Sequence, residues 1–307
     1  MARKSRYARR SLTQRRRSHR SGSPFVKLAL ACTALTAVIG TAGYMAIQET
    51  NYVKADANGC FPGVASRAQT VAIVDSSEPR FDEAQTRDLN QVFNKLIKSE
   101  LRFQERVSII TTEERSIGSV PKPVLTFCHQ AKNAEELTAV GAALVTTAYL
   151  QRQAKKFSAD TYQPVLNRVL GQIADANHRQ TRESPILEQV QSLSQLSDFG
   201  NNPEHRRLIL VSDLIQATEE AQFCVKKGHL PRFEKFKATP YYQRIKPHSL
   251  SGVEVQIYML IRNGYGKKPL RYCSEDELQK FWTAYFKEAG AASVDIIRLR
   301  TGRNHGE

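Results

Sequence analysis

The chain has 307 residues, enough for one large α/β domain or two small ones, and its 41% of hydrophobic residues is ordinary for a protein with a packed core. The formal net charge of +15 is unevenly distributed. Residues 1–27 hold ten Lys or Arg and no Asp or Glu, which leaves 35 basic against 30 acidic residues, or +5, for the rest. This distribution excludes a strongly basic folded domain, and no nucleic acid is expected as a partner of the folded part.

The N-terminal part of the chain is predicted to be a membrane anchor. Residues 1–27 form a basic tail, and residues 28–47 (LALACTALTAVIGTAGYMAI) carry no charge. A helix of this length rises about 30 Å, the thickness of the hydrocarbon core of a bilayer. The segment is apolar on every side and longer than the apolar region of most signal peptides, which favours an uncleaved transmembrane helix over a soluble core helix or a cleaved signal. The lipid bilayer is therefore one expected partner.

The charge of the flanking residues predicts the orientation. Lys and Arg resist translocation, so the tail is expected in the cytoplasm and the rest of the chain on the other side. In a bacterium this describes a single-pass protein of the inner (plasma) membrane with a periplasmic domain. Residues 48–69 are polar and read as a linker, residues 70–300 as the domain, and residues 301–307 as a short tail.

Four elements are predicted in the first half of the domain. Residues 70–74 (TVAIV) and 106–111 (RVSIIT) are short and rich in β-branched residues, which is typical of buried strands. Between them, residues 82–102 carry apolar side chains at helical spacing. Residues 123–128 (PVLTFC) form a third predicted strand, and its short connection to the second suits a hairpin and so an antiparallel pair.

The second half begins with a predicted helical insertion at about residues 131–180. Ser184 before Pro185 is a helix-start signal that predicts a further helix to about residue 196. Another helix is expected to begin at Ser274. The remaining predicted strands are residues 207–212, 253–260 and 294–299.

Strands that alternate with helices indicate an α/β fold, with an open, mostly parallel, Rossmann-like sheet and helices on both faces. Two of the strongest predicted strands are followed directly by a carboxylate, Asp75 and Asp213. Binding sites of such sheets lie at the carboxyl ends of the strands. Both acids are therefore expected on one rim.

Over about residues 70–300 the sequence resembles the von Willebrand factor A (VWA) family. Asp75-Ser76-Ser77-Glu78-Pro79 is similar to the family's first-strand motif Asp-x-Ser-x-Ser, and Ser212-Asp213-Leu214 is similar to a later Thr-Asp-Gly motif. Pro79 stands where the motif has a hydroxyl ligand, and Leu214 stands where it has glycine. The resemblance implies an open α/β sheet with a metal-ion-dependent adhesion site on its upper rim.

Carried over to this chain, the resemblance implies a metal site made by Asp75, Ser77, Ser184 and Asp213. Water would complete the oxygen shell of Mg²⁺ or another divalent cation. The resemblance also implies recognition rather than catalysis, because the cation of such sites takes a carboxylate of a partner protein as its last ligand. The alternative is that Asp75 and Asp213 only cap turns or helix N-termini at the strand ends.

Four cysteines lie outside the apolar segment, an even number that indicates disulfides in an oxidising compartment. In the expected topology, Cys60 precedes the first strand and Cys128 ends the antiparallel third strand, so both lie at the lower rim. Cys224 and Cys273 follow the fourth and fifth core strands at the upper rim. The predicted bonds are therefore Cys60–Cys128 and Cys224–Cys273, and four free buried thiols are the alternative.

The favoured functional hypothesis is a non-enzymatic, membrane-anchored interaction domain with an unidentified protein partner. The first alternative is a metal-dependent hydrolase or nuclease on a similar sheet, which requires Asp198 or Glu78 to join Asp75 and Asp213 around catalytic ions. The second is a structural subunit of an envelope assembly that uses the faces of the helical region at residues 131–180.

Overall fold

The computed structural model describes residues 33, 35–41, 52–64, 67–77, 81–112, 122–174, 183–196, 199, 205–224, 230–260 and 273–299. Two compact units follow each other along the chain, Met1–Tyr52 and Val53–Glu307.

Within the predicted membrane segment, Thr33 and residues 35–41 are helical. Among the described residues, no helix combines the length and apolar character needed to cross a membrane. Several predicted features lie outside these ranges: the tails at residues 1–27 and 301–307, Glu78, Pro79 and Asp198.

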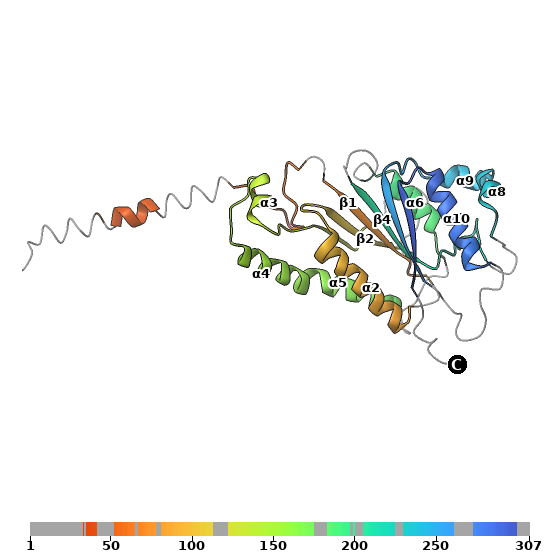
Figure 1. Cartoon of the computed structure of the whole chain (residues 1–307), viewed down its shortest axis with the longest axis horizontal. Helices are drawn as coiled ribbons and strands as arrows, with labels where there is room; N and C mark the ends of the chain where they lie inside the picture. Colours follow the sequence, from red (N-terminus) through yellow and green to blue (C-terminus); the bar gives the residue numbers. More distant parts are fainter. Residues whose placement is uncertain are drawn as a thin grey trace, which may run out of the picture. The chain divides into compact units, whose positions relative to one another are not determined.

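The second unit is built on a six-stranded sheet with the strand order β3-β2-β1-β4-β5-β6 (Figure 1). β3 pairs antiparallel with β2, and the other neighbouring pairs are parallel. The predicted mainly parallel sheet is confirmed, and each predicted strand is present with small shifts at its ends. The strands are β1 (Gln69–Val74), β2 (Arg106–Thr111), β3 (Leu125–Cys128), β4 (Arg206–Ser212), β5 (Val253–Leu260) and β6 (Ser293–Leu299).

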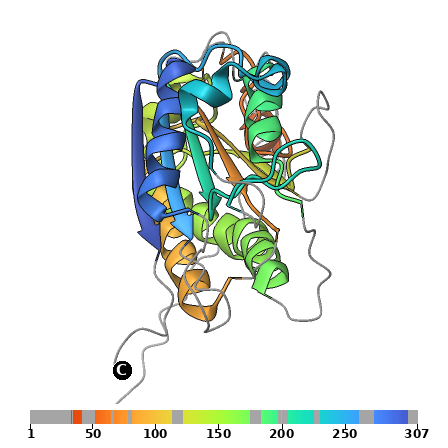
Figure 2. The same cartoon turned by 90° about the vertical axis from the view of Figure 1, so that its right-hand side faces the viewer.

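Helices cover both faces of the sheet, as predicted (Figures 1 and 2). Alternate side chains of a strand point to opposite faces, so Val71 and Ile73 of β1 enter one apolar core while Ala72 and Val74 enter another. This is why a strand buried on both faces is apolar along its whole length. The first core is closed by α6 (Ile186–Ser194) and α10 (Glu275–Glu288), and the second by α2 (Glu83–Lys95) and α5 (Gln163–Ala174).

Two of these helices begin where capping residues stand in the sequence. The side chain of Asp82 accepts the N–H of Gln85 at 2.8 Å, and the Gln85 side chain accepts the N–H of Asp82 at 3.1 Å. Ser274 and Glu277 form the same reciprocal box at the start of α10. Each box satisfies backbone donors that have no partner inside the helix. At its other end, α2 continues into a short π-helix, η1 (Leu96–Glu100).

The predicted helical insertion consists of a short helix and a long helical run. α3 (Ala134–Ala139) is followed by residues 140–146, which are not helical. α4 (Thr147–Phe157), η2 (Ser158–Tyr162) and α5 then follow without a break. The side chain of Thr146 accepts the N–H of Tyr149 and so caps the start of α4.

Two short helices had no predicted counterpart: α8 (Phe233–Lys237) and α9 (Pro240–Ile245). Each is shorter than two turns, so neither shows a helical period in the sequence. Aromatic packing holds α8 in place, because the rings of Phe233 and Phe236 lie 5.6 and 5.3 Å from the ring of Phe281 on α10. α9 packs on α8 in turn, because the ring of Tyr242 lies 5.6 Å from that of Phe236.

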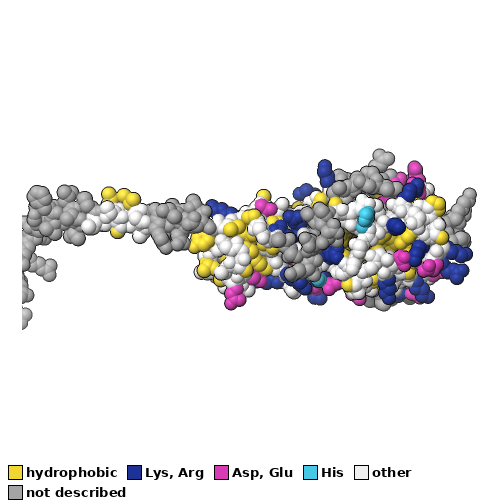
Figure 3. All heavy atoms as spheres, turned by 90° about the horizontal axis from the view of Figure 1, so that it is seen from above, with side chains coloured by type: hydrophobic (Ala, Val, Ile, Leu, Met, Phe, Trp, Pro, Cys, Tyr) yellow, Lys and Arg dark blue, Asp and Glu magenta, His cyan; other side chains and the backbone are white. Residues whose placement is uncertain are grey.

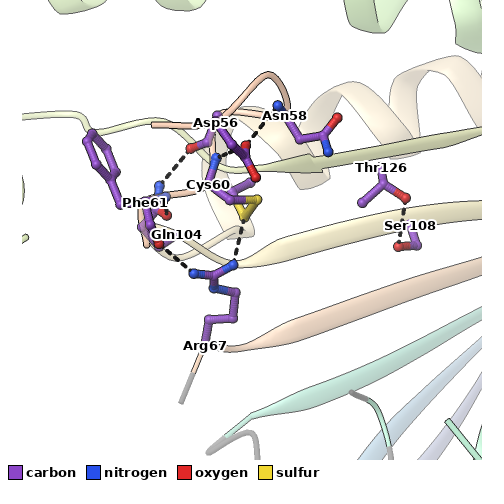
Figure 4. The surroundings of a disulfide bond; sticks show 10 residues. Asp56, Asn58, Cys60, Phe61, Arg67, Gln104, Ser108 and Thr126 are labelled. Carbon is purple, nitrogen blue, oxygen red and sulfur yellow. Dashed lines mark hydrogen bonds between the residues drawn. A yellow bond between two sulfur atoms is a disulfide. The ribbon is translucent and has the colours of Figure 1, made fainter. Parts of the chain in front are cut away.

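Both predicted disulfides are present. Cys60 is bonded to Cys128 with a Cα–Cα distance of 4.9 Å, and Cys224 to Cys273 with 5.3 Å. Figure 4 shows the first bond among the polar side chains that surround it, which include Gln104 and Arg67. Disulfides of this kind are typical of proteins in oxidising compartments.

Part of the predicted linker at residues 48–69 packs on the domain. The N–H of Cys128 donates to the carbonyl of Asn58 at 2.9 Å. Gln104 bonds to this segment twice, donating to the carbonyl of Gly59 at 3.0 Å and accepting the N–H of Phe61 at 2.7 Å. Together with the Cys60–Cys128 bond, these contacts fix the chain well before β1 begins.

His129, beside this disulfide, makes stability depend on pH. Burial, and then the positive charge of Lys132, lower the pKa of His129 to about 4 from 6.5. The unfolded chain therefore binds a proton near pH 6.5, whereas the folded chain does not until about pH 4, so stability falls as the pH falls through this window. We expect the free energy of unfolding to be about 1–2 kcal/mol lower at pH 5 than at pH 7 through this residue. Urea unfolding of wild type and His129→Gln at both pH values measures it, and equal pH dependence in the two proteins would contradict it.

Candidate binding site at the carboxyl edge of the sheet

The carboxylate of Asp75, directly after β1, is the centre of a buried polar cluster. Its Oδ1 accepts the N–H of Ser77 at 3.0 Å and the hydroxyl of Thr112 at 3.1 Å. Its Oδ2 accepts the hydroxyls of Ser184 at 3.0 Å and Ser212 at 2.7 Å. Asp75 is 0% exposed, and these four donors use the roughly four lone-pair positions of a carboxylate.

Three of the four donors come from segments far from Asp75 in the sequence. Thr112 follows β2, Ser212 ends β4, and Ser184 lies just before α6. Ser76 joins the same cluster, because its N–H donates to the Thr112 hydroxyl oxygen at 3.0 Å. The cluster therefore ties together the carboxyl ends of three neighbouring parallel strands.

Asp213 occupies the next strand end. It is buried, and its Oδ1 accepts the N–H of Ile215 at 3.0 Å. In the parallel register Val74 of β1 lies opposite Val211 of β4, so Asp75 and Asp213 leave the sheet at the same rim, as predicted. The turn at Asp213 thus combines a carboxylate with a local capping bond of the kind that the alternative hypothesis proposed.

Leu214 adopts the backbone conformation that suits glycine. Its φ is +66°, in the left-handed region that costs a non-glycine residue about 1 kcal/mol. Its N–H donates to the Ser212 hydroxyl oxygen at 2.9 Å, and its carbonyl accepts the indole N–H of Trp282 at 2.9 Å. These two bonds explain how leucine stands at a position where the resembling motif has glycine.

Ser184 does not cap α6, contrary to the helix-start prediction. The residue at the N-cap position is Pro185, which makes no side-chain capping bond. Ser184 instead pairs with Ala217 through two backbone hydrogen bonds of 2.8 and 3.1 Å. With the backbone paired in this way, the Ser184 hydroxyl donates to Asp75.

The donor set fits a hard cation. A hydroxyl that gives its proton to Asp75 keeps lone pairs for an ion, and the predicted ligands Ser77, Ser184 and Asp213 all bind through oxygen. Across the described ranges, no three of His, Cys, Asp and Glu gather as they do in a site made of those ligands alone. The predicted ligand Asp75 has no lone pair left for a cation, because it accepts four hydrogen bonds. A cation here would therefore rest on hydroxyls, the Asp213 carboxylate and water, which suits Mg²⁺ better than zinc.

The site lies at the point where the strand order reverses. From β1 the chain proceeds outward to β2 and β3, and it then returns to β4 on the other side of β1. Ligands of open α/β sheets bind beyond the carboxyl ends of the strands at this switch point. Asp75 after β1 and Asp213 after β4 are on its two sides.

The comparisons with known proteins add little to these observations. No protein-family profile and no curated protein match the chain. A solved structure with some similarity is that of an aerotolerance-related membrane protein from Bacteroides fragilis NCTC 9343 with multiple mutations to serines. The match has 11% sequence identity and a TM-score of 0.28, and it covers 76% of this chain and 92% of that chain. The class that the fold defines is a mainly parallel α/β domain with a polar, oxygen-lined cluster at its switch point.

Proposed function

We propose that this chain is a membrane-anchored binding protein whose α/β domain lies outside the cytoplasm. The rim cluster around Asp75 is the binding site, and it holds Mg²⁺ or a similar divalent cation through Ser77, Ser184 and Asp213. A cation held there would supply a positive charge, which suits a carboxylate of a protein partner. The VWA resemblance and the position of the cluster at the switch point support this proposal.

The hydrogen bonding of the Asp75 carboxylate is the observation on which the proposal rests. Its oxygens accept four hydrogen bonds, so it has no free lone pair with which to take a proton from a substrate. It instead orients the hydroxyls of Ser184 and Ser212. The Ser212 oxygen also accepts the N–H of Leu214, so Ser184 is the hydroxyl of this pair that offers its lone pairs to an ion. Such an arrangement favours binding over acid–base catalysis.

Two features support the anchor and the compartment. In the helical part of residues 28–47, the hydroxyl of Thr41 donates to the carbonyls of Ala37 and Val38 at 2.8 and 3.0 Å, and that of Thr36 to Thr33 at 3.0 Å. Hydroxyls satisfied within their own helix are suited to a lipid environment, which offers no water. The two disulfides favour an oxidising compartment such as the periplasm.

The test is the thermal unfolding of the full chain in detergent, with excess Mg²⁺ and with a chelator. A cation at about 100 times its dissociation constant stabilises the fold by about 2.7 kcal/mol, a clear upward shift of the melting temperature. Asp213→Asn should abolish this shift. The amide oxygen of asparagine can still accept the N–H of Ile215, so the variant loses the charge and keeps the turn.

The matched control is Asp295→Asn, which removes one carboxylate from an exposed position on β6. It should retain the full Mg²⁺ shift. Absence of a shift in the wild type, or an equal shift in Asp213→Asn, would contradict a cation at the rim.

A further inference from the structure

An uncharged and mostly exposed segment runs from the end of α3 to the start of α4. Fifteen consecutive residues, 137–151 (LTAVGAALVTTAYLQ), contain no Asp, Glu, Lys, Arg or His. Leu144 is 64% exposed and Tyr149 is 43% exposed, although large apolar side chains of this domain are mostly buried. Figure 3 shows hydrophobic side chains gathered at this end of the domain. Exposed apolar side chains that gather at one end of a domain are typical of a surface that contacts a membrane or a partner.

The segment is held in a defined shape. Leu137, Ala142 and Leu150 are buried in a small core of their own together with Ala131. Phe61 and Phe103, with ring centroids 6.3 Å apart, pack against this core. The exposure of Leu144 and Tyr149 is therefore a property of a packed structure, because their neighbours on both sides are anchored.

The chain enters the domain at this segment. The N–H of Val53, the first residue of the second unit, donates to the carbonyl of Gly141 at 3.1 Å. Val53 is itself exposed. The predicted membrane segment ends at Ile47, and six residues span at most about 22 Å when fully extended. If the proposed anchor ends at the bilayer surface, the length of the connecting chain limits Val53 to about that distance from it.

We infer that this apolar end, comprising Val53, Leu144 and Tyr149, rests in the interface of the outer leaflet and docks the domain on the membrane. The inference rests on the proposed anchor. Leucine and valine suit the acyl boundary, and tyrosine is enriched at the headgroup level. Lys54 and Arg152, both exposed, flank the surface and suit anionic headgroups.

A short tether raises the occupancy of a contact that would be weak in a free domain. It holds the surface near the lipid at an effective concentration on the order of millimolar, so three apolar side chains suffice where a free domain would dissociate. The Cys60–Cys128 bond shortens the free tether, because it fixes the following residues to the domain. Docking in this pose would restrict the directions in which the rim site can meet a partner.

The experiment uses the full chain in vesicles of phosphatidylethanolamine and phosphatidylglycerol, with tryptophan as the probe. The chain contains one tryptophan, Trp282, which is 0% exposed and gives a constant background. Leu144→Trp places a second indole on the docking surface. Lipids brominated in the acyl chains should quench its emission about twofold, as expected for a side chain inserted 5–10 Å deep.

The matched control is Ile297→Trp, at an exposed apolar position on β6, which should not be quenched. Equal quenching at both positions, or none at Leu144→Trp in protein that floats with the vesicles, would overturn docking and leave the anchor standing. Emission from Leu144→Trp that changes with the protein-to-lipid ratio without quenching would assign the surface to a second copy. Protein that does not float with the vesicles would overturn the anchor and docking together.

Discussion

Asp75→Ala is expected to lower the free energy of unfolding by about 3 kcal/mol or more, the largest effect of a single substitution at the rim. The alanine leaves the hydroxyls of Thr112, Ser184 and Ser212 and the N–H of Ser77 without their acceptor. These donors are buried, and water cannot readily replace the carboxylate. Urea unfolding followed by Trp282 fluorescence measures the loss, because this indole is buried and bonded to the rim turn at Leu214.

Asp75→Asn separates the charge from the hydrogen bonds. Hydroxyls both donate and accept, so Ser184 and Ser212 can rotate to accept from the asparagine amide, and the loss should be clearly smaller than for alanine. Asp295→Ala, at an exposed position, should change stability by no more than about 0.5 kcal/mol. A loss for Asp75→Ala as small as that of Asp295→Ala would show that the cluster does not hold the strand ends together.

Replacing both Cys60 and Cys128 by serine is expected to cost about 4 kcal/mol. The bond closes a loop between residues 68 apart, and the chain-entropy relation gives a value of about 4 kcal/mol for a loop of this size. The substitution also frees the segment that Gln104 holds through Gly59 and Phe61. Urea unfolding under non-reducing conditions gives the loss of stability, and hydrogen exchange of residues 53–64 gives the local effect.

The pair Cys224→Ser and Cys273→Ser provides the comparison. Its loop of 49 residues predicts a similar loss of stability, about 4 kcal/mol, but residues 53–64 should keep their protection from exchange. Loss of protection in both double variants would mean that the first disulfide has no local role at the entry of the chain. Unchanged stability in either would show that the bond does not form in the protein.

The central strands could be predicted because they are buried on both faces. β1 and β4 must be apolar at nearly every position to fill two cores, and such runs are visible in one sequence. The starts of α2 and α10 were equally visible, because capping acts between residues three apart. α8 was missed, since it is held by Phe281, which is distant in sequence, and α9 was missed because it packs on α8 and is too short to show a helical period.

The site was predicted in part. The positions of Asp75 and Asp213 after two strands placed both on one rim, and parallel pairing of β1 with β4 brings this about. Thr112 also follows a predicted strand directly, a signal that could have added it to the cluster. The resemblance placed Ser184 at the rim with Asp75, and the two are hydrogen-bonded. The predicted capping role of Ser184 was wrong, because Ser-Pro before a helix is a local signal, whereas the pairing of Ser184 with Ala217 is not local.

The sequence by itself determined the order of the elements, the burial of the strands, the apolar segment with its basic flank and, through the expected topology, the cysteine pairs. These depend on periodicity, composition and chain order, which are properties of neighbouring residues. Only the tertiary structure decided that Asp75 is saturated by hydroxyls from three other segments, and that Leu214 takes a glycine-like turn held by Trp282. It also brought Val53 to Gly141 beside the exposed Leu144. Contacts of this kind join residues tens of positions apart, and folding alone brings them within hydrogen-bond distance.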